Sequence, residues 1–302
     1  MPERDPKREQ LRGELAARRA ASDGLRSPAR FVVAVASGKG GVGKSTVSLN
    51  IALALHERGR AVGLLDADLY GPDIPRMLNL ARQEELTRWN FWSRERAISL
   101  EPVERFGLKV MSVGFLLAER QPFSLPGQWT YFVGRQLVHE VDWGRLDYLI
   151  VDLPPGTADL QQELIRLLPL AAAIIVVSPQ DVAHLDAKKV VSLFEQARVR
   201  ILGGVENMAG LSCPHCGEWI SVFPTVRQER SLWALGVPLL AHVPLEPAVA
   251  QAADAGTPAL LARPNAESAA AFRLIANRIA DALELNGRSN HSLPSGESES
   301  RA

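Results

Sequence analysis

Residues 37–46 read SGKGGVGKST, and this stretch decides the fold. The apolar run FVVAVA (31–36) precedes it and an apolar-periodic segment follows, so we expect a buried strand, a glycine-rich turn and a helix in that order. The spacing G-x-x-x-x-G-K-[ST] is that of a phosphate-binding loop, in which backbone N–H groups and the start of the helix face an anion. The alternative is a glycine-rich turn with no ligand. The pattern favours a nucleotide site built from Gly38, Lys39, Gly40, Gly41, Val42, Gly43, Lys44, Ser45 and Thr46.

The polar side chains of this loop have distinct expected roles. Lys44 is placed to reach the β- and γ-phosphates of a nucleotide, and Ser45 is placed to ligate Mg²⁺. Lys39 comes directly after the first glycine, where its cation cannot easily fold back onto the nucleotide of its own loop. We therefore expect Lys39 to reach a phosphate on a neighbouring subunit.

Three aspartates follow two further apolar runs. The run AVGLL (61–65) leads into Asp66 and Asp68, and the run LDYLIV (146–151) leads into Asp152. In doubly wound sheets the carboxyl ends of the strands form the edge where ligands bind. We expect Asp68 to orient the attacking water and Asp152 to hold the Mg²⁺ shell as a Walker B acid. Taken alone, such acids also cap turns or face solvent.

The rest of the pattern predicts one α/β domain. Further strands are expected at 108–113, 171–177, 201–205 and 237–243, and helices at 47–59, 181–199, 248–255 and 267–285, with Asn286 and Gly287 ending the last helix. This alternation indicates a doubly wound, mostly parallel sheet flanked by helices. We expect the domain to cover residues 31–285, between a charged tail (1–30) and a tail of disordered composition (286–302). No role is predicted for residues 81–135.

Composition limits the classes of function. Lys+Arg and Asp+Glu are both 34 and the formal net charge is zero, so nothing favours a nucleic-acid partner. The N-terminal residues, MPERDPKREQ, hold no apolar segment, and no run elsewhere is long enough to span a bilayer. We expect a cytoplasmic protein with no membrane partner.

The only cysteines, Cys213 and Cys216, form one C-x-x-C pair. Tetrahedral zinc or a four-iron cluster usually takes four ligands, and the pair supplies two of them. A second subunit would supply the other two, because an isologous dimer brings the same loop to itself. A thiol redox pair and a pair with no ligand remain alternatives.

The order of these motifs resembles the Mrp/ApbC family of ATP-dependent iron-sulfur cluster carriers. The resemblance covers residues 31–284 and lies in SGKGGVGKST, DADLYGPDIPRML, DYLIVDLPPGTAD, SPQDVAHLDAKK, ILGGVENM and CPHCG. The segment KGGVGK also resembles the deviant Walker A loop of the MinD, ParA and nitrogenase iron-protein class, whose members close as ATP-sandwich dimers.

The resemblance implies a homodimer that binds ATP and Mg²⁺, hydrolyses ATP slowly and holds a [4Fe-4S] cluster between Cys213 and Cys216 of both subunits. It implies two kinds of partner: the apo iron-sulfur proteins that receive the cluster and a scaffold that assembles it. By position it implies catalytic roles for Lys39, Lys44, Asp68 and Asp152, with Lys39 acting across the dimer, and an adenine contact for Asn207.

The chain departs from the family pattern at Asp73, at Ala158 and at residues 222–224 (VFP). The family often has serine, glycine and a glycine-rich stretch at these places, and Ala158 in place of glycine is expected to stiffen the segment after the Walker B acid. Two alternatives compete with the carrier. One is a ParA/MinD-like positioning ATPase, which needs a membrane helix or basic surface that the sequence lacks. The other is a dimer joined by structural zinc.

Overall fold

An eight-stranded sheet forms the centre of the computed structural model, which describes residues 27–69, 71–80, 100–115, 137, 140–157, 159–213 and 215–289, without the side chains of residues 159 and 286–289. The strand order is β10-β7-β6-β1-β5-β2-β4-β3. The bounds are β1 (Phe31–Ser37), β2 (Val62–Asp66), β3 (Val103–Arg105), β4 (Leu108–Ser112), β5 (Tyr148–Asp152), β6 (Leu170–Val177), β7 (Ile201–Asn207) and β10 (Leu239–Val243). Neighbours in this sheet are parallel, apart from the antiparallel pair β3 and β4.

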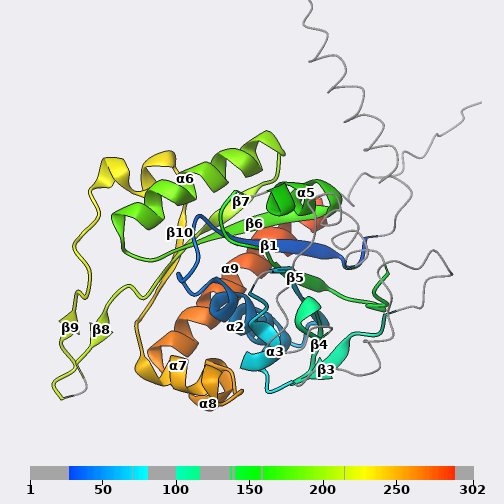
Figure 1. Ribbon diagram of the computed structural model, residues 1–302, viewed down its shortest axis with the longest axis horizontal. Helices are drawn as coiled ribbons and strands as arrows, with labels where there is room; N and C mark the ends of the chain where they lie inside the picture. Colours follow the sequence, from blue (N-terminus) through cyan, green and yellow to red (C-terminus); the bar gives the residue numbers. More distant parts are fainter. Residues whose placement is uncertain are drawn as a thin grey trace, which may run out of the picture.

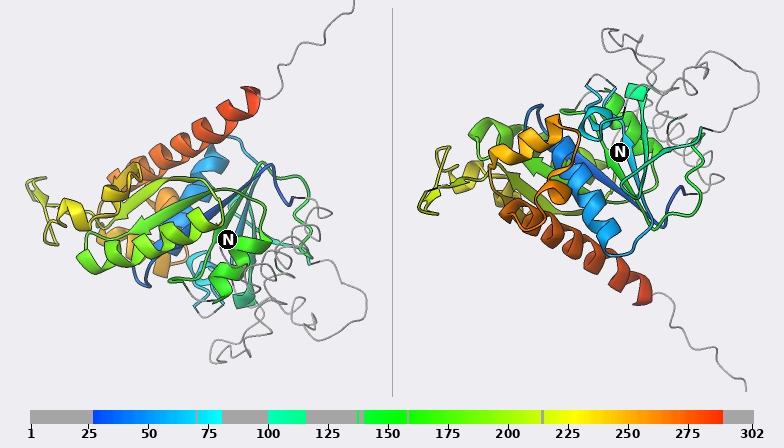
Figure 2. Two further views of the ribbon diagram at one scale, coloured as in Figure 1. Left: turned by 90° about the horizontal axis from the view of Figure 1, so that it is seen from above. Right: turned by 90° about the horizontal axis from the view of Figure 1, so that it is seen from below.

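The central strands are apolar along their length because helices cover both faces of the sheet. β1 (FVVAVAS) is buried after its first residue, and β5 is buried throughout. Parallel sheets covered on both sides need such continuous apolar strands. Helices α2 (Lys44–Glu57) and α9 (Glu267–Ser289) cover one face, and α5 (Asp159–Leu167) and α6 (Asp181–Gln196) cover the other (Figure 1, Figure 2).

Shorter elements complete the described part of the fold. They are α3 (Ile74–Met77), α7 (Pro247–Asp254), α8 (Ala259–Ala262), the 3-10 turns η2 (Val113–Phe115), η3 (Gln228–Arg230) and η4 (Leu232–Leu235), and a separate hairpin of β8 (Leu211–Ser212) and β9 (Trp219–Ile220). The predicted doubly wound, mostly parallel α/β fold is confirmed, as are the predicted strands and helices to within a few residues. We did not predict α5, β3 or the β8–β9 hairpin.

The ends of the domain differ from the expected boundaries. Helix α9 continues to Ser289, past Asn286 and Gly287, so the prediction that this pair ends the helix is wrong. One glycine costs a helix only about 1 kcal/mol, which a long packed helix can absorb. At the other end, Ala29 is buried in the core and the N–H of Arg30 donates to the carbonyl of Leu146, so the last residues of the expected tail belong to the domain.

Several expectations fall outside the described residues. They concern the tails at 1–26 and 290–302, residues 81–99 and 116–136, and Ala158. Within the part of the chain that the structure describes, no helix has the length and apolar character to cross a membrane.

The carboxyl ends of β1, β2 and β5 meet at one edge of the sheet. Asp152 on β5 lies opposite Val35 on β1 and opposite Asp66 on β2 in the strand register. The phosphate loop leaves β1 at this same edge, because parallel neighbours end together. The topology therefore brings the loop and the aspartates to one place.

Candidate functional site

The phosphate loop packs tightly at two of its glycines. A Cβ atom on Gly38 would lie 2.3 Å from the backbone carbon of Asp186 in α6. Gly43 caps the start of α2 with a φ of 81°, and a Cβ there would lie 2.1 Å from Nδ2 of Asn207. Larger residues are therefore excluded at both positions, and the loop is held between α6 and the end of β7.

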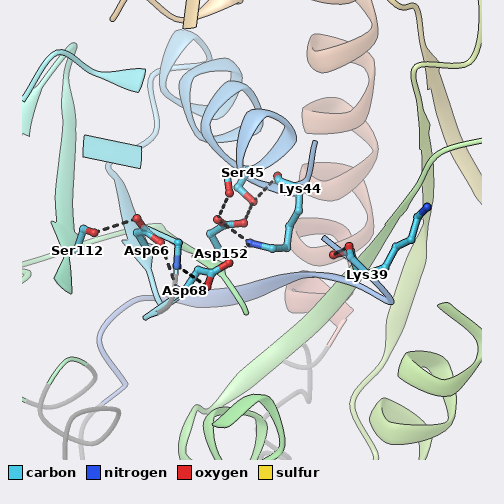
Figure 3. A network of polar contacts seen from close by, with 10 residues as sticks. Lys39, Lys44, Ser45, Asp66, Asp68, Ser112 and Asp152 are labelled. Atoms are coloured by element: carbon cyan, nitrogen blue, oxygen red, sulfur yellow. Dashed lines mark hydrogen bonds and ion pairs between the residues drawn. The ribbon is translucent and has the colours of Figure 1, made fainter. Parts of the chain in front are cut away.

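Asp152 is the centre of the polar network at this edge (Figure 3). Its Oδ2 accepts a hydrogen bond of 2.6 Å from Oγ of Ser45, and its Oδ1 accepts one of 2.7 Å from Oγ of Ser48. Nζ of Lys44 lies 2.8 Å from Oδ2, and the Lys44 side chain is only 6% exposed. One ammonium thus balances the charge of a fully buried carboxylate, and two hydroxyls donate hydrogen bonds to it.

The charge of Lys44 is stabilised by this pairing. Burial acts to lower the pKa of Lys44, but the charge and hydrogen bond of Asp152 outweigh it, so the pKa is raised above its ordinary value. Asp68 adds to this effect, since its Oδ2 lies 3.8 Å from Nζ of Lys44. The structure therefore brings together Lys44, Ser45, Asp68 and Asp152, as the sequence predicted.

The two acids after β2 have different surroundings. Asp66 is fully buried, and it accepts hydrogen bonds from Oγ of Ser112 at 2.9 Å and from the N–H of Asp68 at 3.2 Å. Burial, followed by the nearby charge of Asp152, raises the pKa of Asp66 well above its ordinary value. Asp68 is slightly exposed, and its Oδ1 accepts from the N–H of Gly71 at 3.3 Å. Asp68 is thus the acid with access to solvent, as a water-orienting group requires.

Lys39 lies apart from this network. Its Nζ donates a 2.7 Å hydrogen bond to Oε1 of Gln180, directly before α6. Figure 3 shows the side chain pointing away from Lys44 and the aspartates. This direction agrees with the expectation that Lys39 does not contact the nucleotide bound by its own loop. Its contact with a phosphate on a second subunit remains a prediction.

Asn207, at the end of β7, braces the phosphate loop. Its Nδ2 donates a 2.9 Å hydrogen bond to the carbonyl oxygen of Val42, and the side chain is buried. The expected adenine contact is not tested by this geometry. The bracing role was missed from the sequence, as were the roles of Ser48, Ser112 and Gln180. Of these residues, only Ser48 could have been found from the sequence, because it follows Lys44 by one helical turn and so lies on the same face of the helix.

The cysteines lie at the tip of the β8–β9 hairpin. The N–H of Cys213 donates to the carbonyl of Glu218 at 2.8 Å, and the N–H of Gly217 donates to the carbonyl of Cys213 at 2.9 Å. Both thiols are free, with Cys216 exposed and Cys213 partly exposed. Hydrogen bonds from the backbone of Cys216 and then His215 lower the pKa of Cys213, which favours the thiolate that binds metals. Among the described residues no group of three or more His, Cys, Asp or Glu could hold a metal ion, so the pair stands alone.

Comparisons with known proteins cover most of the chain. Residues 29–280 match the family described as ParA: NUBPL iron-transfer P-loop NTPase. The mouse iron-sulfur cluster transfer protein NUBPL is 39% identical over 84% of this chain and 78% of its own length. The iron-sulfur cluster carrier protein of Synechocystis is 42% identical over 84% of this chain and 71% of its own length.

Solved structures agree with the fold. A nucleotide-binding protein from Archaeoglobus fulgidus in complex with ADP has a TM-score of 0.62 and 34% identity, over 76% of this chain and 87% of its own. The cell division ATPase MinD of Pyrococcus furiosus has a TM-score of 0.60 and 22% identity, over 84% of this chain and 99% of its own, which shows the shared fold.

One experiment distinguishes the role of Asn207 in holding the phosphate loop from a direct contact with adenine. Asn207→Ala removes the hydrogen bond to Val42, worth about 1 kcal/mol, so affinity for Mg-tripolyphosphate should fall roughly fivefold. Calorimetry measures this affinity with a ligand that has no base. Asn277→Ala, an exposed asparagine on α9, is the control and should bind as wild type. Weaker ATP binding with unchanged tripolyphosphate binding would show that Asn207 acts on the base alone.

Proposed function

The chain belongs to the ParA-type family of NUBPL iron-transfer P-loop NTPases, and we propose that it is a homodimeric ATPase that carries a bridging [4Fe-4S] cluster and passes it to apo-proteins. The observation that carries this proposal is the hairpin tip, where two accessible free thiols stand with no third ligand among the described residues. The printed names of the relatives, an iron-sulfur cluster transfer protein and a cluster carrier protein, support the same cargo.

The number of thiols in each chain is the argument for a dimer. A [4Fe-4S] cluster is usually held by four thiolates, and each chain has only Cys213 and Cys216. Two copies related by a twofold axis place both pairs at one point. The exposed tip leaves room for a cluster to enter and to leave, as transfer requires. Zinc also binds four thiolates in a closed structural site. The second candidate function is therefore an ATPase dimer that is joined by structural zinc at the same cysteines.

The arrangement of the phosphate loop supports the binding of Mg-ATP. The glycine loop and the start of α2 offer N–H groups to phosphates, and Lys44 offers a cation. Bound phosphates would compete with Asp152 for Lys44, and the carboxylate of Asp152 and the hydroxyl of Ser45 would then be free to hold Mg²⁺. The metal, when bound, neutralises charge that develops on the phosphates. Asp68 orients the attacking water, and Lys39 leaves Gln180 to reach a phosphate of the second subunit.

A cluster carrier needs one partner that supplies the cluster and others that receive it. A scaffold that assembles clusters loads the dimer, and apo iron-sulfur proteins receive the cluster. The proposed compartment is the cytoplasm. ATP binding and slow hydrolysis gate the transfer by opening and closing the dimer.

The role of Lys44 is tested by its removal. Lys44→Ala loses a charge-assisted contact worth roughly 1.5–3 kcal/mol, so Mg-ATP affinity should fall about tenfold to a hundredfold while the fold persists. Calorimetry and circular dichroism measure the two effects. Lys189→Ala removes an exposed lysine on α6 and should bind ATP normally. Normal ATP binding by Lys44→Ala would exclude the loop from the mechanism.

The two aspartates after β2 should separate hydrolysis from binding. Asp68→Asn cannot orient water as a carboxylate does, so kcat should fall at least tenfold while ATP still binds. Asp66→Asn should cost less, because burial already favours the neutral form of Asp66 and an amide resembles a neutral acid. Single-turnover hydrolysis measures both. Normal turnover by Asp68→Asn with loss in Asp66→Asn would reverse the two assignments.

The cluster depends on both cysteines. Cys213→Ser or Cys216→Ser leaves two thiolates per dimer, which should abolish stable cluster binding after anaerobic reconstitution with iron and sulfide. ATP binding should persist, since the thiols lie outside the nucleotide site. Ser212→Ala changes the neighbouring residue, which contacts Glu267, and should keep the cluster. Iron counting and absorbance decide the outcome, and full iron content in Cys213→Ser would contradict the assignment.

A further inference from the structure

A fully buried histidine, His184, lies in α6, and the proposed function gives it no role. Its Nδ1 accepts a 3.1 Å hydrogen bond from the N–H of Leu232 in η4, and the ring of Trp233 meets the imidazole edge to face, with centroids 5.8 Å apart. A neutral imidazole carries one proton, and the nitrogen that accepts a hydrogen bond does not hold it. The proton of His184 is therefore assigned to Nε2.

Nε2 of His184 faces the carboxylate of Glu206 on β7. Nε2 and Oε1 are 3.4 Å apart, and no described residue forms another hydrogen bond with Nε2. The second oxygen of Glu206, Oε2, lies 2.8 Å from Nδ1 of His242 on β10. Burial acts to raise the pKa of Glu206, but the hydrogen bond of His184 and the charge of His242 outweigh it, so the pKa is lowered below its ordinary value. Glu206 therefore stays ionised and attracts the N–H of His184.

The phosphate loop has two supports. One is α6, which lies so close to Gly38 that a Cβ atom there would be 2.3 Å from the backbone of the helix. The other is the end of β7, where Asn207 donates a 2.9 Å hydrogen bond to the carbonyl of Val42. His184 belongs to the first support, and Glu206, directly before Asn207, belongs to the second. The contact between His184 and Glu206 therefore links the two supports.

The strand carries this link from one face of the sheet to the other. Successive side chains of a strand point to opposite faces. Glu206 points to the face that α6 covers (Figure 1), and Asn207 points to the phosphate loop. A carboxylate held against α6 therefore fixes the end of β7, and with it the position of the next residue.

We propose that His184 is a positioning residue, which holds Glu206 against α6 and so sets the spacing of the two supports of the phosphate loop. Its effect on the binding of phosphates rests on the proposed function, whereas its effect on the loop itself does not. A leucine would need no polar partner in this buried place, but an imidazole is stable there only when both nitrogens are paired. Leu232 pairs one nitrogen, and Glu206 pairs the other.

Two variants separate the contributions of the two nitrogens. In His184→Asn, Oδ1 takes the place of Nδ1 and still accepts from Leu232, but no side-chain atom reaches Glu206. In His184→Gln, the amide nitrogen takes the place of Nε2 and still donates to Glu206, but no atom accepts from Leu232. Only the variant that loses Glu206 should disturb the loop.

Hydrogen exchange of residues 38–46 in the nucleotide-free protein measures the order of the loop, with residues 270–282 of α9 as an internal reference. His184→Asn should exchange about threefold faster in the loop alone, and its affinity for Mg-tripolyphosphate should fall about fivefold in calorimetry. His184→Gln should match wild type in both measurements. The control is His56→Asn, at an exposed histidine near the far end of α2, which should also match wild type.

The variant Glu206→Ala removes the same contact from the other side. It leaves the buried histidine in place, so it carries the test if His184→Asn does not fold. It should loosen the loop as much as His184→Asn does. The double variant should add little to either single one, because both remove one shared contact.

Three results would overturn the proposal. The first is unchanged loop exchange in both His184→Asn and Glu206→Ala. The second is an equal loss in His184→Asn and His184→Gln, which would assign the effect to packing. The third is a looser loop with normal tripolyphosphate affinity. If the loop loosens as expected but the wild type binds neither Mg-ATP nor Mg-tripolyphosphate, the link between the supports is confirmed and the proposed ATPase fails.

Discussion

The buried contact between Lys44 and Asp152 is the interaction on which the nucleotide site depends. Both side chains are almost fully enclosed, and the hydroxyls of Ser45 and Ser48 donate hydrogen bonds to the same carboxylate. Removing one partner of a buried pair costs on the order of 3–5 kcal/mol, because the other charge stays unpaired. Under the proposed function, bound phosphates would take the place of Asp152 beside Lys44, and the carboxylate of Asp152 would then be free to hold Mg²⁺.

Strand β7 connects the two candidate sites of the molecule. Its last residue, Asn207, holds the phosphate loop at Val42, and the chain then continues into the hairpin that carries Cys213 and Cys216. The N–H of Ala209 donates to the carbonyl of Val243 on β10, so this connection is fixed to the sheet. The phosphate site and the thiol pair are thus attached to the same end of the same strand, while the thiol pair itself stays exposed.

The sequence predicted the parts of the site that follow strong local patterns. The glycine loop and the strand end that places Asp152 beside it were predicted correctly, because their spacing is set by backbone geometry that any such loop needs, while the Walker B role of Asp152 stays a prediction. Ser112 and Gln180 could not be found, because they reach the site through strand pairing and a loop far along the chain. The choice between Asp66 and Asp68 was made from position alone, whereas burial gives a physical reason for it. The two-residue strands of the hairpin are too short for any hydrophobic period to indicate them.

The central claim is that one cluster joins two chains through four thiolates. Native mass spectrometry of the anaerobically reconstituted protein tests it most directly, because it weighs the assembly and its metal together. The account predicts a dimer whose mass exceeds that of two chains by one [4Fe-4S] unit. It also predicts that no chain keeps iron after the cluster is removed. A monomer that retains four irons, or a dimer that contains zinc and takes up no iron, would contradict it.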